Sequence, residues 1–168
     1  AADVNNLATA KEDTRQLIMG KLMGRDPSFR QLFLLDLQGQ ELQKISRLSN
    51  LTSDPILKLQ ETILASAHAG KNYISPVYID EKTKEPLILI AVPAKDIFRE
   101  PQGLFVAEVN LKFIWDLVSS IKVGERGLVY VVDKEGTLVA IRDTGRVLKR
   151  ENVSSLKEVA QFKKGISD

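Results

Sequence analysis

The sequence predicts an α+β fold with a central antiparallel sheet and a long N-terminal helix. Apolar segments with strand-like patterns are joined by short polar connections, which favours neighbouring antiparallel strands. Other segments carry apolar residues at helical spacing. The chain has 168 residues, of which 43% are hydrophobic. That composition supports one packed domain, together with part of another.

The N-terminal helix is predicted over residues 3–23, where Asp3 can cap the first turn. Gly24 and Pro27 mark its end. A buried-strand pattern at 32–36 and a more polar strand at 41–47 then form a hairpin. The inward stripe expected on the helix consists of Val4, Leu7, Ala8, Lys11, Leu17, Ile18 and Leu22.

A second helix and three strands follow. Asp54 can cap the helix, and Pro55 suits its first turn because proline lacks the N–H that would go unpaired there. Gly70 fits the C-terminal cap. The strands are predicted at 72–79, 87–92 and 104–109, with 94–102 as a loop. The apolar stripe of the helix is Ile56, Leu59, Ile63 and Ala67.

The remaining chain is predicted to form a helix, a hairpin and a short helix. Asn110 can cap the first helix, and 128–133 with 137–141 form the hairpin. Ser155 and Glu158 have the spacing of a capping box that opens the last helix. Trp115 is expected to pack. The inward residues expected on the first of these helices are Ile114, Leu117, Val118 and Ile121.

The two predicted hairpins repeat each other. Asp36 and Gly39 recur as Asp133 and Gly136, an offset of 97 positions, and an apolar run precedes each aspartate. Aspartate can bond backbone amides further along a turn, and glycine tolerates positive φ. The repeat suggests two copies of one fold, of which the second is cut short.

Composition excludes several functions. The chain has no cysteine and one histidine, so it cannot form a disulfide, a thiolate metal site or a multi-histidine site. We therefore expect no metal, no cofactor and no catalytic constellation. The net charge of +2 argues against a broad nucleic-acid-binding face. The longest apolar run, 87–92, is too short to span a membrane.

The order of these elements resembles the Cache family of bacterial sensor domains, of the double-Cache type with two PAS-like modules in tandem. The residues that carry the resemblance are 32–39, 73–78, 103–113 and 124–136. It implies a membrane-distal sensor module over 1–123 and a partial, membrane-proximal second module over 124–168. It also implies a periplasmic or extracellular domain of a membrane receptor, most like those of sensor histidine kinases.

The family pocket lies on one face of the first-module sheet, under the helix and loops of 48–72. The resemblance therefore points to Tyr73, Ser75 and Tyr78, although alternation places Tyr78 on the face opposite Tyr73, with Pro76 able to shift it. Both tyrosines could equally be core residues. The family's amino-acid receptors carry Arg and Trp just before this strand, which are absent here, and Asn110 stands near the position of their Asp. Lys71 or Arg47 could hold a carboxylate.

Glu108 interrupts an apolar strand, and we expect it on an outward position of a half-exposed sheet, with a pocket acceptor as the alternative. His68 is expected to benefit from its place late in a helix rather than to bind a metal.

The predicted function is signal reception by binding a small-molecule ligand. The alternatives are a ligand-free dimerisation or spacer module of a receptor, such as a chemoreceptor or a cyclic-dinucleotide enzyme, and an enzyme. The N-terminal helix is also expected to pair with its copy in a homodimer.

Overall fold

A computed structural model describes residues 6–48, 55–124 and 127–165. Asp3, Val4 and Asp54, to which the sequence assigned roles, lie outside the described residues. The chain forms two compact units. The first unit consists of residues 1–75 and 88–109, and the second consists of 76–87 and 110–168.

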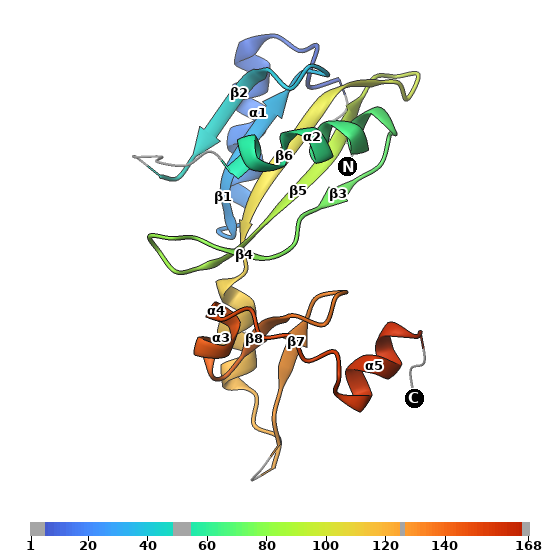
Figure 1. Ribbon diagram of the computed structural model, residues 1–168. Coiled ribbons are helices and arrows are strands. Elements are labelled where there is room, and N and C mark those ends of the chain that lie inside the picture. The colour runs from blue at the N-terminus through green and yellow to red at the C-terminus, as the bar shows by residue number, and fades with distance from the viewer. Residues whose placement is uncertain (1–5, 49–54, 125–126, 166–168) are drawn as a thin grey trace. The chain divides into compact units, whose positions relative to one another are not determined.

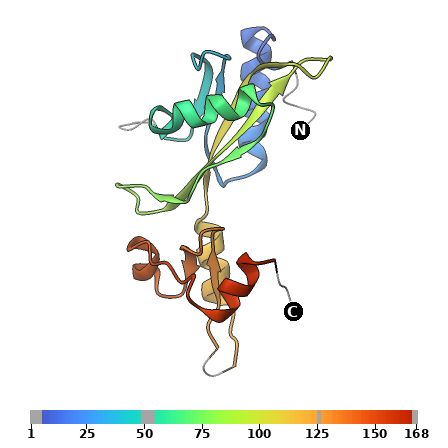
Figure 2. The same cartoon turned by 45° about the vertical axis from the view of Figure 1, so that its right-hand side comes forward.

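The first unit contains most of a six-stranded sheet, in agreement with the predicted α+β class. The strand order is β2-β1-β6-β5-β3, and β4 also pairs with β5. Helices α1 (Glu12–Arg25) and α2 (Pro55–His68) cover opposite faces of this sheet (Figures 1 and 2). The strands of this sheet are β1 (Phe29–Leu35), β2 (Glu41–Ser46), β3 (Tyr73–Ile74), β4 (Tyr78–Ile79), β5 (Pro86–Lys95) and β6 (Pro101–Asn110), of which β4 and the start of β5 belong to the second unit.

Helix α1 begins at Glu12, which is nine residues later than the sequence predicted. Residues 6–10 form turns instead. The backbone N–H of Asn6 donates to the carbonyl of Lys95 at 2.8 Å, and Asn6 takes a positive φ of 62°. The buried helical residues are Met19 and Met23, whereas the predicted stripe residue Leu17 is 58% exposed. The inward face is therefore rotated from the predicted one.

The predicted turn chemistry is confirmed in both hairpins. One carboxylate oxygen of Asp36 accepts from the N–H groups of Gln38 and Gln40, and Asp133 does the same for Glu135 and Thr137, at 2.8–2.9 Å. The glycines of both turns have φ near +84°, at 83° and 85°. A third turn of this kind, which the sequence analysis missed, connects β5 to β6. There Asp96 accepts from residues 98 and 100, and Arg99 takes the glycine position with φ 68°.

The strand predicted at 72–79 is wrong as one element, because it is divided into β3 and β4. Tyr73 pairs with Ala91, whereas Tyr78 pairs with Leu87, so one extra residue lies between them on this side. Pro76 has no N–H to donate to the ladder, which accounts for the break. The loop predicted at 94–102 is shorter than expected, since β5 and β6 extend into it and leave only 96–100.

The second unit contains α3 (Lys112–Ser120), the hairpin of β7 (Tyr130–Val132) and β8 (Leu138–Ile141), α4 (Thr144–Leu148) and α5 (Lys157–Lys163). Trp115 packs as predicted, and its ring N–H donates to the carbonyl of Val139 at 2.7 Å. The sequence did not predict α4. The apolar core of this unit is Leu138, Ile141, Val147, Val153 and Val159.

Two predictions about the helices of the second unit are wrong. Leu117 and Ile121 were expected inward on α3, but both are exposed and Val118 is the buried residue. The predicted capping box does not form, because Leu156 stands at the N-cap of α5 without a side-chain bond. Glu158 instead accepts from the hydroxyl of Tyr130 at 2.8 Å. The contact of Glu158 with the distant Tyr130 thus replaces its predicted local contact with Ser155.

Candidate functional site

A buried polar cluster lies between the inner strands β1 and β6 of the first-unit sheet, near one end of both strands. Glu108 on β6 is 3% exposed and Gln31 on β1 is 2% exposed. The side-chain amide of Gln31 donates to the Glu108 carboxylate at 2.7 Å. The guanidinium Nε of Arg30 lies 3.6 Å from the same carboxylate oxygen. Removing a carboxylate from water costs free energy unless hydrogen bonds or ion pairs replace its hydration. The contacts from Gln31 and Arg30 supply this replacement for Glu108.

A bulge in β1 brings the three side chains together. The β1–β6 register shifts between Phe29 and Gln31, so Arg30 is the extra residue. A bulge bends the strand and redirects a side chain that strict alternation would send to the other face. Arg30 and Gln31 can therefore both reach Glu108.

The cluster lies on the face of the sheet that α2 covers. Gln43 on β2 bonds Gln16 of α1 and stands opposite Leu34, so Leu34 faces α1. Gln31 is three residues from Leu34 and therefore has the opposite parity, and its partner Glu108 shares its face. This is the face on which the resemblance placed a ligand pocket.

The expectation that Glu108 lies on an outward position is wrong. Strand β1 pairs with β6 along one edge, and α2 covers the face of the sheet to which the Glu108 side chain belongs. Gln31 and Arg30 were not among the predicted site residues. Gln31 gave a weak signal, as a polar residue at the start of an apolar strand. The pairing of residues 31 and 108, which are 77 positions apart, appears only once the strand order is known.

Tyr73, Ser75 and Tyr78 lie alongside β5, with their side chains on one face. They stand opposite Ala91, Leu89 and Leu87, which alternate along the strand. The extra residue near Pro76 thus returns Tyr78 to the face of Tyr73, so the face that alternation assigned to it is wrong. Ser75 is buried, and its hydroxyl accepts from the N–H of Leu89 at 2.9 Å.

The other predicted site residues lie elsewhere. Arg47 donates to the backbone carbonyls of Phe29, Met23 and Asp26 and so holds the connection between α1 and β1. Lys71 is exposed after the C-terminus of α2. Asn110 accepts from the N–H of Lys112 at 2.8 Å just before α3, but Leu111 is the N-cap of that helix and has no side-chain cap bond, so the predicted capping role of Asn110 is wrong.

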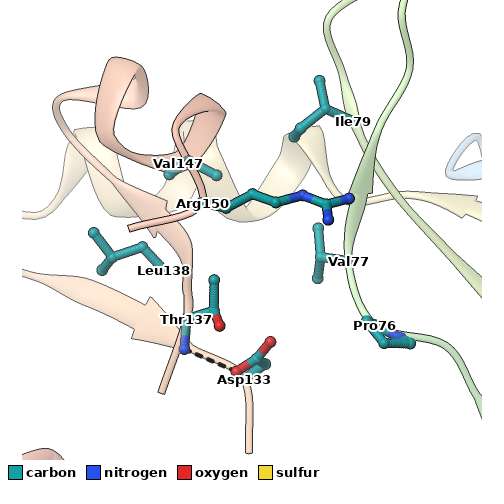
Figure 3. Close-up of a pocket in the computed structure, with 8 residues that line it drawn as sticks. All are labelled: Pro76, Val77, Ile79, Asp133, Thr137, Leu138, Val147 and Arg150. Carbon is teal, nitrogen blue, oxygen red and sulfur yellow. Dashed lines mark hydrogen bonds between the residues drawn. The ribbon is translucent and has the colours of Figure 1, made fainter. Parts of the chain in front are cut away.

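A hollow of about 150 Å³ lies in the second unit (Figure 3). Arg150 extends across it toward Val77 and Ile79, and Asp133 and Thr137 lie on another side. No role was predicted for this hollow, which is lined by the 76–79 segment, the second hairpin and the α4 region. Its apolar walls are Pro76, Val77, Ile79, Leu138 and Val147.

Within residues 6–48, 55–124 and 127–165, no group of three or more His, Asp or Glu side chains could hold a metal ion. No helix of this described part is long and apolar enough to cross a membrane.

Two surface pairs in the second unit shift pKa values. A hydrogen bond from Arg146 holds the pKa of Glu151 below its ordinary value of 4.5. The pKa of Glu158 is also lowered, first by its own backbone N–H and then by the Tyr130 hydroxyl. Burial, and then Glu158, raise the pKa of Tyr130. The hydrogen bonds to both carboxylates therefore favour their ionised form.

Acid should weaken the second unit through these two carboxylates. A lowered pKa contributes stability above the unfolded-state value of about 4.3 and loses it as the pH falls through the folded-state value. We expect the melting temperature of Glu151→Gln to lie below that of the wild type at pH 7 and to converge with it as the pH falls below 4. Melting curves followed by circular dichroism measure this difference. A gap that persists unchanged at pH 3 would contradict the assignment.

The fold has solved counterparts. The extracellular domain of a proposed histidine kinase, mmHK1S-Z2, matches 99% of this chain and 74% of its own length with a TM-score of 0.66 and 13% identity. The ligand-binding domain of the amino acid chemoreceptor PctB of Pseudomonas aeruginosa PAO1, in complex with L-glutamine, matches 94% and 63% with a TM-score of 0.64 and 21% identity. That of PctC from the same organism, in complex with GABA, matches 89% and 67% with a TM-score of 0.63 and 17% identity.

No family model matches this sequence, and no curated protein matches it. The chain spans from 63% to 74% of the length of the three structures named above. It has the α+β fold of these sensor domains, as the resemblance to the Cache family predicted.

Proposed function

We propose that this chain is an extracytoplasmic sensory region of a transmembrane receptor, and that its first unit binds a small organic molecule. The observation that carries the proposal is the fold, which matches an extracellular histidine-kinase domain along 99% of the chain. Chemoreceptor domains with amino acids or GABA bound have the same fold. The proposed role is recognition rather than catalysis. We further propose that the parent protein is a two-component histidine kinase.

The proposed ligand site is the α2-covered face of the first-unit sheet, together with Tyr73 and Ser75, whereas Tyr78, which was predicted with them, belongs to the second unit. Support comes from the buried cluster around Glu108, which places a carboxylate and an amide beneath α2. Such a cluster can orient a polar ligand, while tyrosine offers an apolar ring and one hydroxyl. Ligand binding would shift the population between two arrangements of helix against sheet.

A ligand that binds the folded chain should raise its melting temperature. At 100 times its dissociation constant, the gain is about 2.7 kcal/mol, or roughly 5–10 °C for a chain of this size. We would screen amino acids, GABA and short mono- and dicarboxylates by thermal shift. Tyr73→Ala should reduce the shift of any stabilising compound by half or more.

Tyr130→Phe provides the matched control, because Tyr130 belongs to the second unit. It should leave the ligand-induced shift unchanged. A shift that survives Tyr73→Ala would place the site elsewhere. If no compound stabilises the chain, the ligand-free spacer becomes the better proposal.

We also propose a weak homodimer through α1. Leu17 is 58% exposed on this helix, opposite the buried Met19 and Met23, and provides an apolar contact for a second copy. Sedimentation velocity at high protein concentration should show a dimer that Leu17→Glu abolishes. A wild-type chain that remains strictly monomeric would contradict this.

The division into a sensor module over 1–123 and a partial second module over 124–168 stays part of the proposal. The second hairpin supports it, because its turn repeats the hydrogen bonds of the first. Helix α3 and residues 76–87 pack with the second hairpin. They would supply part of the core that a two-stranded hairpin lacks.

A further inference from the structure

The hollow in the second unit has an arginine where the backbone favours glycine. Arg150 follows the C-cap of α4 and has a left-handed φ of 53°. Its N–H donates to Val147 at 2.8 Å, and the next N–H donates to Arg146 at 3.1 Å. This is the Schellman arrangement, in which glycine is the usual residue because other side chains are strained there.

Two other helices of the chain show the usual solution. Gly70 after α2 has φ 64° and Gly165 after α5 has φ 74°. The same pair of backbone bonds forms at Gly70. Its N–H donates to the carbonyl of Ala67, and the N–H of Lys71 donates to the carbonyl of Ser66. A strained residue that retains a long cationic side chain is a reason to ask what that side chain does.

The guanidinium of Arg150 is available to a ligand. In the described part of the chain, no hydrogen bond or ion pair holds it, in contrast to Arg146, whose guanidinium bonds both oxygens of Glu151. Figure 3 shows Arg150 extended across the hollow toward Val77 and Ile79. A guanidinium with open donors matches the geometry of a carboxylate.

Asp133 supplies the opposite charge in the same hollow. One of its oxygens accepts the N–H groups of Glu135 and Thr137, and nothing among the described residues bonds the other. A simple anion on Arg150 would be repelled by this carboxylate, whereas a molecule that also carries an ammonium group would bind both. The hollow, with a volume of about 150 Å³, can hold a ligand of a few heavy atoms.

We infer that this hollow binds a small zwitterion, with its carboxylate on Arg150, its ammonium on Asp133 and its methylene groups against the apolar walls. The site lies within the second unit and does not depend on the proposed ligand site of the first. The probes are glycine, β-alanine and 4-aminobutyrate, in which the two charges lie progressively further apart. Propionate and propylamine each carry one of the charges and serve as controls.

The experiment follows backbone amides of the 15N-labelled 168-residue chain by NMR during titration. At least one zwitterion should cause saturable shifts at Val77, Thr137 and Leu138, and both single-charge controls should bind more weakly. Arg150→Gly and Asp133→Asn should each weaken binding about tenfold or more, because each removes a charge-assisted contact. Tyr73→Ala, which tests the first-unit site, should leave these shifts unchanged.

The variants are chosen so that lost binding cannot be mistaken for unfolding. Arg150→Gly relieves the left-handed strain and should melt no lower than the wild type. Asp133→Asn keeps the oxygen that accepts the turn amides, and Asp36→Asn is its matched control in the first hairpin. The inference is overturned if Arg150→Gly binds as the wild type does, or if no zwitterion gives saturable shifts at about 10 mM.

Discussion

Replacing Gly103 with alanine should lower the free energy of unfolding by about 3 kcal/mol, because the new methyl group would overlap the backbone of the neighbouring strand. A Cβ on Gly103 would lie 2.4 Å from the carbonyl oxygen of Leu35 and 3.0 Å from Cβ of Ala8. The first contact is with backbone, which cannot rotate away. The β1–β6 pair would have to separate at this point.

Gly20→Ala is the matched control for this substitution. Gly20 lies in α1, where nothing stands within 4 Å of the added atom. Alanine at an exposed helical position should raise the free energy of unfolding by about 0.5–1 kcal/mol. Urea denaturation measures both variants. If Gly103→Ala is as stable as the wild type, the close approach of β6 to β1 is wrong.

Glu108→Ala should also cost about 3 kcal/mol. It leaves a cavity in which the amide of Gln31 has lost its acceptor and the guanidinium of Arg30 has lost the carboxylate of its ion pair. Glu108→Gln retains an acceptor oxygen and should cost less. The same urea measurement checks both, since each variant changes the midpoint of unfolding rather than its slope.

A double variant separates polar pairing from packing. Gln31→Leu with Glu108→Leu replaces the cross-strand pair by apolar side chains in register. Leucine at both positions removes the donor and the acceptor together but leaves Arg30 without this carboxylate, so the double variant should be more stable than Glu108→Ala and less stable than the wild type. If both are equally destabilised, the loss comes from the volume of the side chains and not from their hydrogen bond.

The sequence was sufficient wherever local chemistry decides the structure. The turn roles of Asp36 and Asp133 and the end of α2 at Gly70 depend on residues within four positions. Each was predicted from residue type alone.

The sequence was insufficient where a distant partner decides. The start of α1 depends on a bond from Asn6 to Lys95, and the environment of Glu108 depends on Gln31. Glu158 likewise left its predicted capping role for Tyr130. In each case the competing contact joins parts of the chain that no local pattern relates. Arg150 is a different case, because its unusual feature is a backbone angle rather than a partner.

The order of the strands has a consequence for synthesis. Strand β1 pairs with its sequence neighbour β2 on one side, but its other side pairs with β6, which ends at Asn110. A ribosome adds about 5–20 residues per second, so the second edge of β1 stays open for several seconds after the first hairpin is complete. Its apolar residues could pair with another nascent chain during that interval. A chaperone that covers the Phe29–Leu35 edge would have to release it when β6 emerges.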